Sequence, residues 1–189
     1  MTMKRSLGLG LAALATLIIV PLAQGSPVMA RLQIIGTEIA QQVRRPEVKL
    51  VLQAEKQVQT VDAQGKPQLL WQTLEGEATV QPQDVLRYTV ASENAGEMPA
   101  KDLVITQSIP PQMTYVLATA TGNDGTAITY SIDGGKSFVA EPLVEVVQED
   151  GTVTLEPAPA EAYTDIRWDF AQTLEPEVVV QVAYDVTVK

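Results

Sequence analysis

The chain has 189 residues, with 13 lysines and arginines against 23 aspartates and glutamates, and it contains no histidine and no cysteine. Without these two residue types it cannot form a Ser-His-Asp triad, a cysteine nucleophile or a disulfide, and it lacks the imidazole and thiolate ligands of zinc, copper and iron–sulfur sites. The net charge of −10, which no basic stretch offsets, argues against nucleic acid or an anionic membrane surface as a partner. A hydrophobic content of 46% predicts one folded domain with appendages rather than a disordered chain.

The N-terminal residues 1–30 have the organisation of a secretory signal. The basic pair Lys4-Arg5 precedes an almost wholly apolar run over 7–23, and small residues follow it. Two cleavage points have suitable small residues before them, one after Gly25 and one after Ala30. We therefore predict a signal peptide and an exported protein. The alternative is an uncleaved anchor, because the apolar run nearly reaches membrane-spanning length. A lipoprotein anchor is excluded because it requires a cysteine.

Residues 31–46 show little pattern, and we expect them to form a tether to a folded domain over 47–189. Within that domain apolar and polar residues alternate, which is the period of a half-buried β-strand. The alternation is clearest where Leu86, Tyr88 and Val90 share one face. The predicted strands are 48–61, 67–74, 84–94, 103–109, 113–118, 128–132, 136–139, 143–148, 152–155, 165–170 and 178–188.

Turn-forming residues separate these strands. Asp133-Gly134-Gly135 and Glu149-Asp150-Gly151 each predict a β-hairpin, since Asp-Gly pairs suit the tight turns that join antiparallel strands. Many short alternating strands with no convincing helix predict an all-β fold, either an antiparallel β-sandwich or a barrel.

Several segments resemble one known family, the prokaryotic conserved-repeat domain of unknown function number eleven. The similarity covers about 48–189, the whole predicted domain, and the blocks 130–138 and 157–163 are most similar to single-domain cyanobacterial versions. The other matching segments are 76–90, Glu93-Asn94-Ala95-Gly96, 103–115, Trp168-Asp169-Phe170 and the valine-rich strand after Leu174-Glu175-Pro176.

The resemblance implies an immunoglobulin-like antiparallel β-sandwich in a cell-surface or envelope protein, and it carries over no catalytic residues. One feature departs from the family, in which turns commonly use Pro-Gly. Here the corresponding pairs are Pro82-Gln83, Pro111-Gln112 and Pro176-Glu177. A type II turn needs a positive φ after the proline, which Gln and Glu resist. We expect type I turns at these pairs, or else strain of about 1 kcal/mol each.

Residues 131–138 have the spacing of an Asp-box, Ser-x-Asp-x-Gly-x-Ser-aromatic. In sialidase-type propellers that motif is a structural hairpin, in which the aspartate bonds local backbone amides. One interpretation is a carbohydrate-associated module. We expect the other, a well-formed turn capped by Asp133, because Asp-Gly turns are common.

Two further sets of residues are candidate binding groups. Loop oxygens could meet in a calcium site, although no Asp-x-Asp-x-Asp-Gly loop is present, and we expect neither a metal nor a cofactor. Aromatic rings could form a sugar-stacking platform, but we expect most to lie in the core, Trp168 in particular, with Tyr163 the most exposed. The loop oxygens belong to Asn123, Asp124, Asp133 and Asp150, and the rings to Trp71, Tyr88, Tyr115, Tyr130, Tyr163, Trp168 and Tyr184.

These observations favour a non-enzymatic, exported structural or adhesive module of the cell envelope. No residue is assigned a catalytic, cofactor-binding or metal-binding role. The main alternative is a carbohydrate- or protein-binding module that uses loops at one end of the sandwich or an open strand edge. A hydrolase built on two carboxylates is a third class, but among 23 acidic residues no pair stands out. The expected partners are envelope proteins or surface glycans, and the oligomeric state is open.

Overall fold

A computed structural model describes residues 46–76 and 78–189. The predicted signal peptide over 1–30, and the predicted tether except for Pro46, lie outside the described residues. Within them no helix has the length and apolar character needed to cross a membrane.

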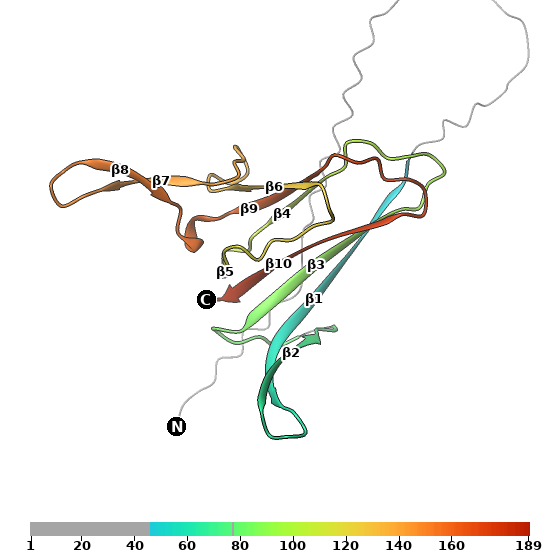
Figure 1. Cartoon of the computed structure of the whole chain (residues 1–189), viewed down its shortest axis with the longest axis horizontal. Coiled ribbons are helices and arrows are strands. Elements are labelled where there is room, and N and C mark those ends of the chain that lie inside the picture. The colour runs from blue at the N-terminus through green and yellow to red at the C-terminus, as the bar shows by residue number, and fades with distance from the viewer. Residues whose placement is uncertain (1–45, 77) are drawn as a thin grey trace, which may run out of the picture.

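The described chain folds into two packed antiparallel sheets with a separate hairpin (Figure 1). The larger sheet has the spatial order β2 (Pro67–Thr73), β1 (Val48–Val61), β3 (Val85–Asn94), β10 (Val179–Val188) and β5 (Met113–Tyr115). The smaller sheet has the order β4 (Val104–Ser108), β9 (Asp165–Phe170) and β6 (Thr126–Ser131). The predicted all-β antiparallel sandwich is therefore confirmed.

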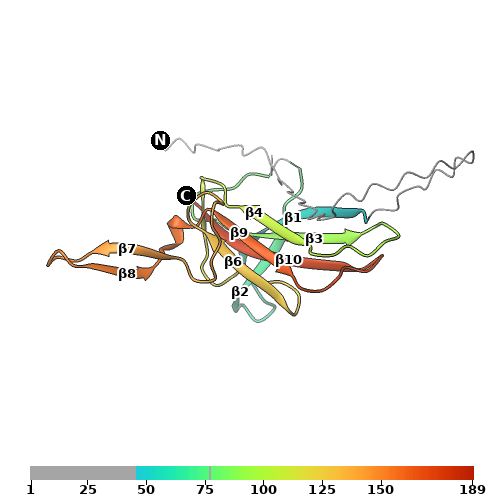
Figure 2. The same cartoon turned by 90° about the horizontal axis from the view of Figure 1, so that it is seen from above.

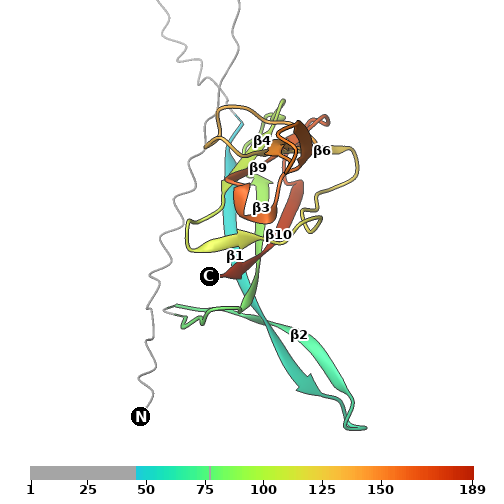
Figure 3. The ribbon, with the colours of Figure 1, turned by 90° about the vertical axis from the view of Figure 1, so that its left-hand side faces the viewer.

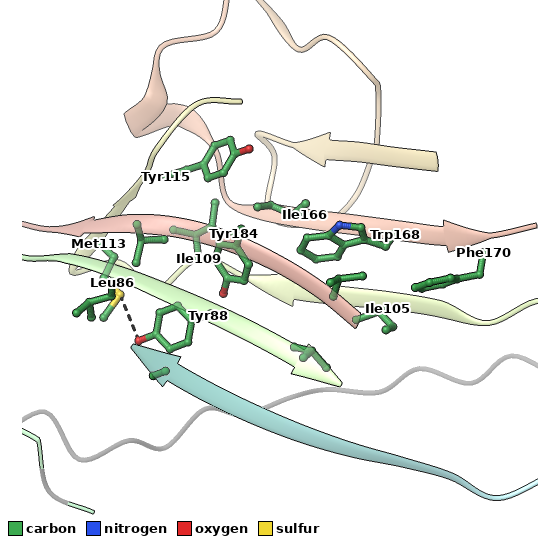
Figure 4. Close-up of a cluster of buried hydrophobic side chains, with 14 of the residues drawn as sticks. Leu86, Tyr88, Ile105, Ile109, Met113, Tyr115, Ile166, Trp168, Phe170 and Tyr184 are labelled. Carbon is green, nitrogen blue, oxygen red and sulfur yellow. Dashed lines mark hydrogen bonds between the residues drawn. The ribbon is translucent and has the colours of Figure 1, made fainter. Parts of the chain in front are cut away.

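The core lies between the two sheets, where the alternating positions of their central strands meet (Figure 4). From β3 come Leu86, Tyr88 and Val90, and the facing strand β9 supplies Trp168, which is completely buried. The other central contributors are Ile105, Ile166, Phe170, Val182, Tyr184 and Val186. Burying each such aliphatic or aromatic side chain contributes roughly 1.5–3 kcal/mol. Because apolar residues alternate along the strands, this energy is gained only when the apolar face of each sheet packs against the other sheet.

Two hairpins extend beyond the sandwich. Strand β1 pairs with β3 only as far as Lys56, and its last residues continue with β2 alone (Figure 3). The second hairpin consists of β7 (Leu143–Val147) and β8 (Val153–Pro157), which pair with each other in a sheet of their own. It projects to the side of the sandwich (Figures 1 and 2). A single 3₁₀ turn, η1 (Ala160–Ala162), leads from it to β9.

One predicted strand is wrong. Residues 136–139 form no strand, and only Val139 makes an isolated bridge, to Tyr130. The Asp133 carboxylate accepts the N–H groups of Lys136 and Ser137, so these amides close a turn instead of joining a ladder.

The three proline turns divide between the two predicted outcomes. Each is closed by a backbone hydrogen bond across the turn, from Asp84, Met113 or Val178. Gln83 has φ +74° and Glu177 has φ +64°, so these two turns carry the strain that the sequence predicts for side chains after proline. Gln112 does not have a positive φ.

Asn94 fixes the end of β3. Its side chain is completely buried, and the Nδ2 amide donates to the carbonyls of Met98 and Leu174 at 2.8 and 2.9 Å. Its Oδ1 accepts the N–H of Gly96. Because every polar atom of this amide has a partner, Asn94 joins the end of the larger sheet to the loop before β10 without an orphaned group.

Candidate functional site

The Asp-box turn follows β6 and is held together by the Asp133 carboxylate. Its oxygens accept the hydroxyls of Ser131 and Ser137 at 2.7 and 2.6 Å and the N–H groups of Lys136 and Ser137, both at 3.0 Å. These bonds, those from Ser137 foremost, hold the pKa of Asp133 well below its usual range. The carboxylate is therefore ionised and fully engaged with its own turn, as the structural interpretation predicts.

A second layer of hydroxyls ties this turn to the sandwich. Ser131 Oγ accepts the N–H of Gly135 at 2.9 Å, and Thr164 Oγ1 accepts that of Gly134 at 3.1 Å while donating to the Ser131 carbonyl. Both glycines have a positive φ, at +74° and +79°, and a side chain at the second would meet the buried carboxylate of Asp165. The aromatic residue of the box, Phe138, packs under the Arg167 guanidinium, 3.9 Å from the ring centre.

The candidate calcium ligands form no common site, and three of the four are bonded to other groups of the fold. Asn123 Oδ1 accepts the N–H of Gln181 at 2.7 Å, and Asp150 accepts both the N–H and the hydroxyl of Thr152. Asp133 closes the turn described above. Among the described residues no group of three or more acidic side chains is placed to hold a metal ion.

The aromatic candidates are packing residues and do not form a flat platform. Trp168, Tyr88, Tyr115 and Tyr184 are buried in the core, as predicted for Trp168. Tyr130 and Tyr163 are half-buried against Tyr115, with the Tyr130 and Tyr163 rings inclined by 78°. Trp71 on β2 is covered by the Arg87 guanidinium at 4.1 Å, and Arg87 in turn forms a two-pronged ion pair with Asp185. Stacking on a sugar would need an open ring face, and these rings face one another or a guanidinium.

A shallow depression of about 60 Å³ lies between the loop after β9 and the loop that holds Asn123 and Asp124. Leu103, Phe170 and Leu174 are among its apolar lining residues. Sites for small molecules usually enclose about 300–1,000 Å³, so this depression has room for no more than a single small side chain.

The hairpin β7–β8 presents the clearest candidate for a binding surface among the described residues. We call residues 143–157 the arm. Opposite residues of an antiparallel pair point to the same side, and one side of the arm carries three such pairs. These six residues, here named the arm face, are Leu143 with Pro157, Glu145 with Leu155, and Val147 with Val153. Its four large aliphatic side chains are all exposed, Val147 to 70% and Leu155 to 65%.

The other side of the arm mixes apolar and polar side chains, with Val144 opposite Glu156 and Val146 opposite Thr154. Gln148 Nε2 donates to Thr154 Oγ1 at 2.7 Å and to Glu156 at 2.9 Å. Asp150 closes the turn at the tip. The hydroxyl and the N–H of Thr152 both donate to its carboxylate, and these hydrogen bonds lower the pKa of Asp150. The sequence predicts this hairpin but not its face, since alternation alone does not reveal whether an apolar side meets the core or remains outside it.

Comparison with known proteins supplies no relative for this chain: no family model, no curated protein and no solved structure matches it. Its functional assignment therefore rests on the geometry above, and the resemblance to the conserved-repeat domain, with the immunoglobulin-like topology that it implies, stays a prediction.

Proposed function

We propose that this protein is a non-enzymatic structural or adhesive module of the cell envelope that binds a partner protein through the β7–β8 arm. The observation that carries the proposal is the exposed apolar arm face on a hairpin that pairs with neither sheet of the sandwich. The signal-like N-terminal segment supports export, and the resemblance to envelope domains supports the location.

The physical argument starts from stability. A two-stranded hairpin is at best marginally stable in water unless an apolar side is covered. Here Val147, Val153 and Leu155 lie in the open, so the hairpin gives up burial energy that a sandwich strand would gain. Exposed apolar side chains gathered on one element are typical of surfaces that bind other proteins.

Protein is favoured over carbohydrate as the ligand. The arm face offers aliphatic side chains and no aromatic ring, whereas sugar binding usually relies on stacking against an open ring. The aromatic residues of the sandwich are packed together or covered, as described for Tyr130, Tyr163 and Trp71.

The test compares binding of purified protein to envelopes isolated from the native cells, measured by co-sedimentation. In the arm variant Val147→Thr/Leu155→Thr we expect binding to be weakened at least about tenfold, because two aliphatic contacts are lost. Threonine favours β-strands, so the hairpin itself should be kept. The matched control is Val61→Thr/Leu69→Thr on the β1–β2 hairpin, whose side chains are 64% and 61% exposed. Equal binding by the two variants would contradict the proposal.

A further inference from the structure

The arm is acidic as well as apolar. Residues 143–157 contain four acidic residues and no lysine or arginine, and Glu145 lies within the arm face itself. Two arms placed face to face would bring these carboxylates together, and like charges in an interface cost several kcal/mol. The charge pattern therefore disfavours arm-to-arm pairing and calls for an apolar partner that carries positive charge.

Such a partner segment exists in the chain itself. Residues 31–45, which precede the described part, contain three arginines and one glutamate, a net charge of +2. Apolar residues are spread along the same segment, at Leu32, Ile34, Ile35, Ile39 and Val43. Cleavage after Ala30, one of the two predicted points, would add the positive α-amino group next to Arg31.

We infer that the arm face of one copy binds residues 31–45 of a second copy, so that the protein associates head to tail. The inference rests on the proposed function, whose partner it identifies. Apolar side chains of the segment cover Val147, Val153 and Leu155, and its arginines meet the acidic residues of the arm. The interface is heterologous, with a different surface on each copy, and such contacts propagate into chains or close into rings.

The fold favours a second copy over the same copy. The end of β1 at which the described chain begins lies on the opposite side of the sandwich from the arm, in two perpendicular views (Figures 1 and 2). To reach its own arm face, a segment attached there would have to pass across the sandwich, whereas the arm of a second copy sets no such requirement.

Salt gives this interface a distinctive signature. Two copies with a net charge of −10 repel each other as whole molecules, so screening should strengthen any association driven by apolar contact alone. Local pairing of arginines with arm carboxylates predicts the reverse, weaker association as salt rises.

The experiment measures self-association of the exported protein, purified with the N-terminus that export leaves and with residues 31–45 intact. The method is sedimentation velocity over a dilution series. We expect association that weakens when NaCl is raised to about 1 M, where the Debye length is about 3 Å. The arm variant Val147→Thr/Leu155→Thr and the segment variant Arg44→Glu/Arg45→Glu should each associate at least about tenfold more weakly than the parent. The matched controls, Val61→Thr/Leu69→Thr and Lys101→Glu/Lys136→Glu, should associate like the parent.

Mixing the two defective variants tests the head-to-tail arrangement directly. The segment variant keeps an intact arm and the arm variant keeps an intact segment, so an equimolar mixture should form heterodimers and nothing longer. A parent chain that is monomeric at every concentration overturns the inference, as does association that survives Arg44→Glu/Arg45→Glu. If the parent is monomeric but its envelope binding still depends on the arm, this inference fails and the proposed function stands; arm-independent envelope binding removes both.

Discussion

At the scale of single residues, the aspartates at the hairpin tips act on their own backbone. Asp62 accepts the N–H groups of Gln64 and Lys66, Asp133 closes the Asp-box turn, and Asp150 closes the tip of the arm. A short carboxylate that bonds amides two to four positions ahead stabilises a turn without any partner elsewhere in the fold. Part of the negative charge of the chain is thus explained by turn formation, and these oxygens are not free to gather around a cation.

Asp133 gives a prediction at this scale. Replacing it by alanine leaves the amides of Lys136 and Ser137 without their acceptor, so we expect Asp133→Ala to lower the melting temperature at neutral pH by several degrees. Because the pKa of the folded-state carboxyl is depressed, its contribution is present above the ordinary pKa near 4 and is lost as pH falls through the lower folded value. The gap between parent and variant should therefore narrow in acid, as thermal unfolding at several pH values will reveal.

Asp124→Ala, a change in the neighbouring loop, is the control and should leave melting nearly unchanged. An Asp133→Ala protein that melts like the parent at neutral pH would contradict the structural role of the turn and point to binding instead.

At the scale of elements, most strands follow from alternation and turn residues, while their partners do not. The predicted ranges 48–61 and 165–170 coincide with β1 and β9, because long alternation and polar turns mark both ends. That β3 lies between β1 and β10 is set by contacts far apart in the sequence, which no local pattern encodes. The strand expected at 136–139 fails for a local reason, the capture of its amides by Asp133.

The candidate site divides in the same way. The role of Asp133 is predictable, since a carboxylate three and four residues before free amides needs no tertiary partner. The arm face is not, because Val147 and Leu155 look like ordinary inward-facing strand residues until the fold leaves them uncovered.

The proline turns give a prediction for these connections. Gln83→Gly removes a side chain from a residue with a positive φ, which should stabilise the folded state by about 1–2 kcal/mol. Glycine also gives the unfolded chain more conformational freedom, which should cost about 0.5–1 kcal/mol. We expect a net change in the free energy of unfolding between zero and a gain of about 1.5 kcal/mol, measured by urea denaturation. Gln112→Gly is the matched control and should lose about 0.5–1 kcal/mol, because only the entropic cost remains there. Equal losses in both variants would refute the strain at Gln83.

At the scale of the whole molecule, the sandwich and the arm differ in how they are held. Strand β3 is paired on both sides and packs into the core, whereas β7 and β8 pair only with each other. The free energy of local opening is much smaller for elements with few buried contacts than the free energy of global unfolding. The fold thus combines a sandwich held by many contacts with a hairpin that pairs only with itself.

Amide hydrogen exchange of the segment variant Arg44→Glu/Arg45→Glu, in which no second copy covers the arm, should separate the two. We expect amides of 143–157 to exchange orders of magnitude faster than those of β3 and β10, which open only near global unfolding. The β1–β2 hairpin provides an internal reference in the same spectrum or peptide map. Protection of the arm equal to that of β3 would mean that the arm is already covered, and would contradict its description as an open surface.

The placement of the first and last strands has a mechanical consequence. Strands β1 and β10 flank β3, each in nine antiparallel pairs, with Val48 opposite Asn94 and Thr187 opposite Val85. A pull on the two ends of the domain therefore acts along the strands, and the hydrogen bonds, which lie across them, are loaded in shear. Within each ladder the nine pairs share the load instead of opening one at a time. A domain pulled at these two ends would therefore resist opening until a whole ladder gave way.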